Sequence, residues 1–340
     1  MTGLALVGLW VLLACQQAET PQSPEVSYEL ELPAHFPSSP ALAAYDLTPE
    51  KVALGKRLFF DVGLSRDSSL SCAACHLSEA GFADHAKVSI GVDGRTGFRN
   101  VPTLANIGYH PYFFREGGSP TLHQQALGPI EDHNEMDLNP VALVARLKTD
   151  ATYQRLAEEA YDRPMGVFVL TRALAAFQHT LISGNAPYDA FLQGDSSALS
   201  PAAQRGESLF FSERTQCGNC HGGLDLSTYQ LENNGLYESY QDLGRYRVSL
   251  DSADIGKFKV PSLRNIAQTW PYMHDGSLPN LAAVIEHYNQ GGVGHPNQSD
   301  LIRPLGLTDA EKADLLAFLH SLSDPDFLAG KTAQLLPISE

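Results

Sequence analysis

The chain has 340 residues, which is more than one domain usually holds. Of these residues 43% are hydrophobic, enough to form two buried cores. Its 39 acidic side chains outnumber 23 basic ones and give a formal net charge of −16. This balance excludes nucleic acid as a favoured partner, because phosphate backbones attract basic surfaces. It favours a basic redox protein that electrostatic attraction can steer to the surface, although solubility alone would also account for the charge.

The N-terminus predicts export. An uncharged run from Leu4 to Ala14 has the length of the apolar part of a secretory signal and is too short to span a bilayer. It ends in the letters LLAC, which resemble the lipobox of bacterial lipoproteins and make Cys15 the predicted lipid anchor. Because no Lys or Arg precedes the run, an ordinary cleaved signal and an uncleaved anchor remain alternatives. Residues 1–15 are therefore predicted to be the signal, and residues 16–40, rich in Pro and Ser, a tether.

Two similar segments predict the same helix twice. LTPEKVALGKRLFF occupies residues 47–60, and LSPAAQRGESLFF occupies residues 199–211. In each segment Thr48 or Ser200 can cap a helix whose first residue is proline, and the apolar residues that follow lie on one face.

A second pair of segments is also repeated, since VPTLANIGYHPYFFREG at 101–117 is echoed by VPSLRNIAQTWPYMHDG at 260–276. The chain is thus predicted to contain two variants of one module, 41–190 and 191–340. Helical stretches separated by Gly- and Pro-rich loops, with little strand-like alternation, predict a mostly α fold.

Four of the five cysteines form two copies of C-x-x-C-H, with Cys72, Cys75 and His76 in the first and Cys217, Cys220 and His221 in the second. A c-type haem is attached by thioethers to such a pair, and the adjacent histidine can ligate its iron. Zinc ribbons usually bring their cysteine pairs together over some tens of residues, whereas Cys72 and Cys217 are 145 residues apart. A disulfide within each pair would need no histidine. The motifs therefore predict two haem c groups, one in each half.

Residues 45 to about 295 resemble the bacterial di-haem cytochrome c peroxidase and MauG family. The resemblance is carried by both C-x-x-C-H motifs and by GVDGRTGFRNVPTLANI, LHQQALGPIEDHNEM, FKVPSLRNIAQTWPYMHDGSL and VIEHYNQGG. It implies two tandem cytochrome c-like domains, each with one covalently bound c-type haem, and a calcium ion between them. It also implies that hydrogen peroxide reacts at the first haem, while the second receives electrons from a small cytochrome c or cupredoxin. Such a protein would be periplasmic, and a homodimer is one assembly that the resemblance allows.

The resemblance assigns catalytic roles to Gln125 and Glu135. Splitting peroxide requires a group that moves a proton between its two oxygens and polar groups that stabilise the departing oxygen. Glu135 would be the acid/base and Gln125 the hydrogen-bonding group that orients peroxide. Without the resemblance, both would be interpreted as solvated polar residues.

Many relatives close the resting first haem with a loop histidine, and the corresponding position here is Val92. His85 is expected to be a surface residue, and neither His110 nor His123 matches a ligand position. The first haem is therefore expected to have His76 as its only protein ligand and to react with peroxide without prior reduction.

The second haem has two candidate sixth ligands. Met273 carries the thioether typical of high-potential cytochromes. The family's variable axial position, however, falls on Tyr288, which we favour, with Met273 packing near the haem. A phenolate ligand would lower the reduction potential and a thioether would raise it.

Two further inferences concern the space between the haems. The resemblance places calcium on the Asn100 side chain and the backbone carbonyls of Thr269 and Pro271, although Asn100 can also serve as a turn or cap residue. Arg115 replaces the tryptophan usual between the haems, and a guanidinium cannot be oxidised as an indole can. Trp270 is expected to pack in the core, with a role in electron transfer as the alternative.

Three functions therefore remain. The favoured one is reduction of hydrogen peroxide. A MauG-like oxidase that modifies a protein or organic substrate is the second, favoured by Tyr288 and opposed by Arg115. A non-catalytic di-haem electron carrier is the third, and it would leave Gln125 and Glu135 without a task.

Overall fold

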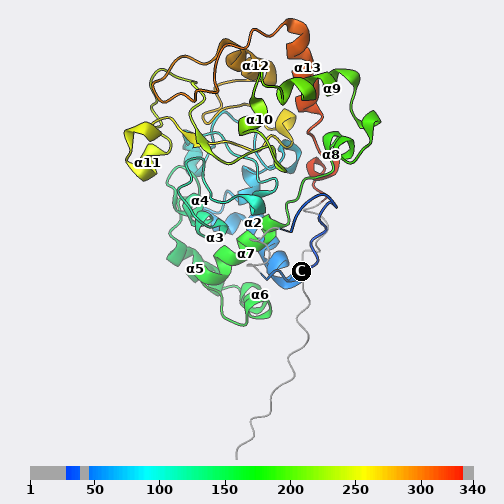
Figure 1. Cartoon of the computed structure of the whole chain (residues 1–340). Helices are drawn as coiled ribbons and strands as arrows, with labels where there is room; N and C mark the ends of the chain where they lie inside the picture. Colours follow the sequence, from blue (N-terminus) through cyan, green and yellow to red (C-terminus); the bar gives the residue numbers. More distant parts are fainter. Residues whose placement is uncertain (1–27, 39–45, 332–340) are drawn as a thin grey trace, which may run out of the picture.

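The computed structural model describes residues 28–38 and 46–331, and in this part the chain is mostly helical, as predicted (Figure 1). The predicted signal, the lipid anchor Cys15 and most of the tether lie outside the described residues. Within the described ranges no helix is both long and apolar enough to cross a membrane.

The first half contains α2 (Pro49–Phe60), α3 (Leu122–Gln125), α4 (Leu127–Glu131), α5 (Pro140–Lys148), α6 (Ala151–Tyr161) and α7 (Val167–His179), with short 3-10 turns at Val62–Leu64, Cys72–Ala74, Ser78–Ala80, Val92–Gly94 and Ile107–Tyr109. The second half contains α8 (Pro187–Leu192), α9 (Pro201–Phe210), α10 (Cys217–Cys220), α11 (Tyr246–Ser249), α12 (Leu281–Gln290), α13 (Asp309–His320) and α14 (Pro325–Leu328), with 3-10 turns at Ser196–Ala198, Ser252–Asp254 and Ile266–Gln268. A two-stranded antiparallel sheet pairs β1 (Leu231–Glu232) with β2 (Phe258–Lys259), Leu231 lying opposite Lys259.

The two predicted helices, α2 and α9, are confirmed together with their caps. The Thr48 hydroxyl accepts a hydrogen bond from the backbone N–H of Lys51, and the Ser200 hydroxyl accepts one from Ala203. Each hydroxyl satisfies a backbone donor that has no partner within the helix. The proline that follows each cap already has the backbone angle of a helix and lacks the N–H that would need a partner.

Each half is built around one close helix crossing. In the first half α2 crosses α7 at Gly55, where an added Cβ would lie 1.8 Å from the carbonyl oxygen of Ala173. In the second half α9 crosses α13 at Gly206, where an added Cβ would lie 1.9 Å from the carbonyl oxygen of Asp314. Because both approaches are backbone to backbone, only glycine fits at either point.

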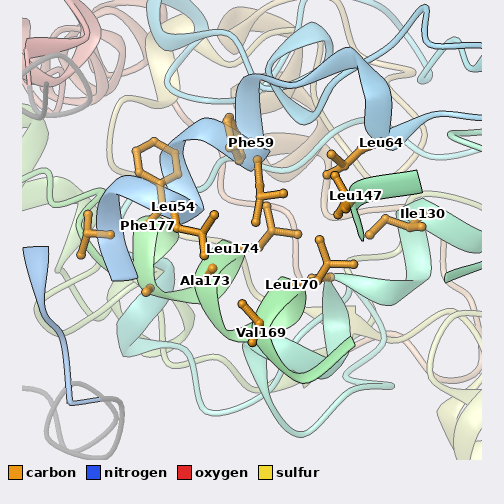
Figure 2. Packing of buried hydrophobic residues seen from close by; sticks show 14 of the residues in the cluster. Leu54, Phe59, Leu64, Ile130, Leu147, Val169, Leu170, Ala173, Leu174 and Phe177 are labelled. Carbon is orange, nitrogen blue, oxygen red and sulfur yellow. The ribbon is translucent and has the colours of Figure 1, made fainter. Parts of the chain in front are cut away.

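The apolar faces at these crossings form the two cores. Leu54 and Phe59 of α2 pack with Leu174 and Phe177 of α7 (Figure 2), and the rings of Phe59 and Phe177 lie 5.1 Å apart. In the second half, the rings of Phe210 and Phe318 lie 5.2 Å apart. Burying side chains of this size contributes about 1.5–3 kcal/mol each.

Buried polar contacts join the halves. The Asn106 side-chain amide donates to Asp225 at 2.9 Å, and the Asn265 side-chain amide donates to the Ser183 hydroxyl at 2.9 Å. The chain also returns at its end to the first half, where Phe327 of α14 packs in the first core. The boundary proposed at residue 190 falls within α8, whose Tyr188 packs in the second core.

Candidate haem and peroxide site

Both C-x-x-C-H motifs line one continuous cavity with a volume of about 680 Å³. A tight turn holds each motif: the N–H of His76 donates to the Cys72 carbonyl at 3.0 Å, and that of His221 donates to the Cys217 carbonyl at 2.8 Å. The same local geometry therefore presents two thiols and an imidazole to the cavity in each half.

The two motif histidines are prepared as ligands in the same way. The Nδ1 atom of His76 lies 2.7 Å from the Phe82 carbonyl, and Nδ1 of His221 lies 3.1 Å from the Leu226 carbonyl. Since a carbonyl only accepts, Nδ1 carries the proton and Nε2 keeps a lone pair for a metal. Burial lowers the pKa of His76, and it lowers that of His221 to about 4, so both imidazoles are neutral.

The cysteines also fit thioether attachment. All four motif cysteines are free thiols in the structure. Among the described residues, no group of three or more His, Cys, Asp or Glu side chains is arranged to hold a metal ion. Haem attachment would use all four cysteines and both histidines, whereas a disulfide within each pair would leave the histidines without a role.

Gln125 and Glu135 both line the cavity, together with Cys72 and Cys75. Gln125 ends α3, and Glu135 lies in the turn after α4, where its N–H donates to the Asp132 carbonyl at 3.0 Å. Burial raises the pKa of Glu135 to about 7, and the nearby charge of Asp132 adds to the effect. A carboxyl group with this pKa can both take up and release a proton near neutral pH.

Two of the three other candidate histidines lie away from the cavity. Val92 is buried, and its N–H donates to the Glu135 carbonyl at 2.9 Å, but its side chain does not line the cavity. Neither His85 nor His123 lines the cavity. His110 does line it; its Nδ1 lies 3.1 Å from the Lys259 ammonium, whereas its buried Nε2 lies 3.5 Å from the Asp225 carboxylate and has no hydrogen-bond partner among the described residues.

The expectation that Trp270 packs in the core is wrong, since the residue is 42% exposed. Its ring stacks on His85 with centroids 4.0 Å apart. The neighbouring residues Thr269 and Pro271 line the cavity, and Trp270 between them lies on the outer side of this segment.

Tyr288 and Met273 both line the cavity. Tyr288 lies on α12 near Cys217 and Cys220, and burial raises its pKa to about 12. Asn234 is a hydrogen-bond partner of the Tyr288 hydroxyl and also donates to the Met273 sulfur at 3.2 Å. The Asn234 side chain therefore contacts both candidate ligands, Tyr288 and Met273, and both line the cavity that reaches the second motif.

The three residues expected to bind calcium line the same cavity. The Asn100 side-chain oxygen, however, accepts a hydrogen bond from the Arg115 guanidinium at 3.0 Å, and its backbone oxygen accepts a second at 2.8 Å. Two unit charges about 4 Å apart repel by about 4 kcal/mol in surroundings of this kind, and calcium carries two charges. With Arg115 in this position, Asn100, Thr269 and Pro271 do not fit a calcium ion.

Comparison with known proteins agrees with this geometry. The family model described as di-haem cytochrome c peroxidase matches residues 49–197, and the one described as cytochrome c matches residues 203–323. The methylamine utilization protein MauG of Methylorubrum extorquens is 37% identical over 323 residues, which cover 93% of this chain and 91% of MauG. The chain belongs to the di-haem cytochrome c peroxidase family.

Two further relatives support the assignment. Cytochrome-c peroxidase IdrP1 of Denitromonas iodatirespirans is 34% identical and covers 85% of each chain. The crystal structure of a MauG-like protein associated with microbial copper homeostasis superposes with a TM-score of 0.85 at 35% identity, covering 90% of this chain and 98% of that one. As a di-haem cytochrome c peroxidase the chain carries two tandem cytochrome c domains with two haem c groups, and it is an oxidoreductase of the peroxidase type.

Two residues of this peroxidase's cavity carry little sequence signal. Lys259 lies between the halves, where its ammonium donates to the Tyr112 carbonyl at 2.9 Å and burial lowers its pKa to about 7. A lysine directly before the repeated V-P-S-L segment was the available signal. Asn234 gave no such signal, because a single amide in a loop has no recognisable pattern.

Proposed function

We propose that the protein reduces hydrogen peroxide to water, with electrons that enter at the His221 half and are used at the His76 half. The observation that carries the proposal is that Gln125 and Glu135 both line the cavity, with the Glu135 carboxyl close enough to Cys72 and Cys75 for its charge to raise the pKa of both thiols. An electron carrier would have no use for a buried carboxyl group whose pKa is raised to about 7.

The haem, when bound, would supply redox-active iron that passes electrons to peroxide. Glu135 would take a proton from one peroxide oxygen and return it to the other, which leaves as water. The Gln125 amide donates a hydrogen bond that orients peroxide and stabilises charge on the departing oxygen. One peroxide, two electrons and two protons then give two water molecules.

The cavity beside His76 supports direct access for peroxide. Valine stands at position 92, and neither His85 nor His123 lines the cavity. The first haem would therefore have His76 as its only protein ligand, and we expect it to react without prior reduction of the second.

Electron paramagnetic resonance of the fully oxidised protein tests this state. We expect a high-spin signal beside a low-spin one, with loss of the high-spin signal when peroxide is added and with turnover when reduced small cytochrome c is supplied. Two low-spin signals that peroxide leaves unchanged would overturn the ready state, and absence of turnover would overturn the peroxide reductase.

The proposal includes a location and a partner. Haem attachment to C-x-x-C-H and the N-terminal signal support the periplasm, with Cys15 as a lipid anchor to the membrane. The net charge of −16 supports a basic cytochrome c or cupredoxin as the donor. A homodimer is compatible with this arrangement. Calcium is not part of the proposal, because Arg115 already engages Asn100.

A MauG-like oxidase is the second candidate. Tyr288, buried beside the second cysteine pair, favours it, because a tyrosine ligand stabilises oxidised iron. The similarity to MauG supports the same candidate. A covalent change in a co-encoded protein, produced by peroxide and this enzyme alone, would identify this activity.

A further inference from the structure

Arg115 lies where the two halves meet. Its backbone carbonyl accepts a hydrogen bond from the N–H of Lys259, in β2 of the second half, at 2.6 Å. Its side chain lines the shared cavity. Both the backbone and the side chain of Arg115 are therefore fixed at the junction.

The guanidinium is directed at Asn100. Nε and Nη2 donate to the Asn100 backbone carbonyl at 3.1 and 2.8 Å, and Nη2 also donates to the side-chain oxygen at 3.0 Å. The orientation of the amide follows from a second contact, in which its nitrogen donates to the Ala86 carbonyl at 3.3 Å. Both oxygens of Asn100 thus face one fixed positive charge.

The neighbouring carboxylates do not neutralise this charge directly. Arg99 pairs with Asp242 at 2.6 Å and with Glu116, and the side chain of Asp275 accepts a hydrogen bond from Tyr237 at 2.6 Å. Burial and the charge of Arg99 lower the pKa of the Arg115 guanidinium to about 10, although the charges of the three carboxylates act to raise it. An arginine keeps its charge under such conditions better than any other side chain.

The backbone on the other side of the cavity reaches the same residue. The N–H of Asn100 donates to the His274 carbonyl at 2.8 Å, which ties Asn100 to the segment that follows Thr269 and Pro271. Asn100 is therefore held by the second half through its N–H and by Arg115 through both of its oxygens.

We propose that the Arg115 guanidinium is the built-in cation of this junction, that it takes the place that the family gives to calcium, and that the protein is independent of calcium. One residue then accounts for both departures from the family pattern: the missing tryptophan and the occupied asparagine oxygen. The guanidinium organises Asn100 as a metal ion would, with a charge that a chelator cannot remove.

The test uses the purified protein with both haems, dialysed against EGTA. Calcium content is measured by mass spectrometry, and calcium binding by titration calorimetry together with the haem absorption spectrum. We expect the wild type to hold less than about 0.1 calcium per chain and to show no spectral change when calcium is added. R115Q frees the Asn100 oxygen and removes the charge, so it should bind calcium at least about 10-fold more tightly than the wild type.

Two further variants separate charge from position. R115K keeps a positive charge and should remain calcium-independent. R245Q removes a positive charge that contacts the carbonyls of Glu116 and Gly117 but not Asn100, and it should bind no more calcium than the wild type. One calcium per wild-type chain, or equal calcium affinity in R115Q and the wild type, would overturn the proposal. If R115Q does not fold, the calcium content of the wild type and calcium binding by R115K still test the proposal. No arm measures peroxide turnover, so the outcome is independent of the proposed function.

Discussion

At the scale of single residues, Glu135 determines the pH dependence that we expect. Burial raises its pKa to about 7, and the base that accepts a proton from peroxide is the ionised form. The fraction of that form grows as the pH rises through about 7, so the second-order rate constant with peroxide should rise over the same range. E135Q should lower the rate constant by about 100-fold or more and remove this dependence.

The matched control is E131Q, because Glu131 is an exposed carboxylate four residues earlier. Stopped-flow mixing with peroxide across pH 5–9 compares the second-order rate constants of the wild type, E135Q and E131Q. The rate constants of E131Q and the wild type should agree to within about 10-fold. An E135Q rate constant equal to that of the wild type would remove Glu135 from the proton transfer.

Single substitutions can also identify the sixth ligand of the second haem. If Tyr288 is the ligand, Y288F should raise the reduction potential of that haem by about 100 mV or more, because a phenolate stabilises oxidised iron. M273L should leave the potential nearly unchanged, since Met273 then serves only as a packing residue and as an acceptor for Asn234. Spectroelectrochemical titration measures the reduction potential of the second haem in both variants. A large change in M273L with little change in Y288F would identify Met273 as the ligand.

At the scale of elements, the repeated helix crossings explain why two helices begin alike and carry glycine in the same place. G55A and G206A each force a Cβ to within 2 Å of a backbone oxygen, so the crossing helices must separate. Each variant should lose about 3 kcal/mol of stability and lower Tm by about 5 °C or more. G118A is the control, since a Cβ there meets nothing closer than 3.5 Å. Calorimetry in which G55A melts like G118A would show that the crossing adapts.

The elements also show what the sequence could predict. The capped helices after Thr48 and Ser200 were predictable because hydroxyl, proline and apolar spacing are local signals. The two C-x-x-C-H motifs carry the thiols and imidazoles in five consecutive positions, so their chemistry is local as well. The contact between Arg115 and Asn100 joins residues from separate loops, and no local pattern encodes it. Similarly, the exposure of Trp270 depends on which side of its segment faces the cavity.

At the scale of the whole molecule, the two halves divide the proposed work. The first half presents Gln125 and Glu135 to peroxide, and the second presents Tyr288 and Met273 beside its cysteine pair. One cavity reaches both motifs, as the proposed transfer of electrons from the second half to the first requires. The helices of the two halves lie at opposite ends of the molecule (Figure 1), and in the proposed function electrons would cross the junction where Arg115 and Lys259 are hydrogen-bonded.

The net charge of the whole molecule predicts how salt changes the reaction with the electron donor. A net charge of −16 attracts a basic donor over distances that salt shortens, since the Debye length falls from about 30 Å at 0.01 M to about 3 Å at 1 M ionic strength. The second-order rate constant for oxidation of a basic small cytochrome c should therefore fall about 10-fold or more between 10 mM and 500 mM NaCl. Hydroquinone, an uncharged reductant, should show less than about a 2-fold change and serves as the control for salt effects on the enzyme itself. A rate constant that rises with salt would mean that the basic cytochrome c docks on a basic patch, whose local charge outweighs the net charge of the molecule.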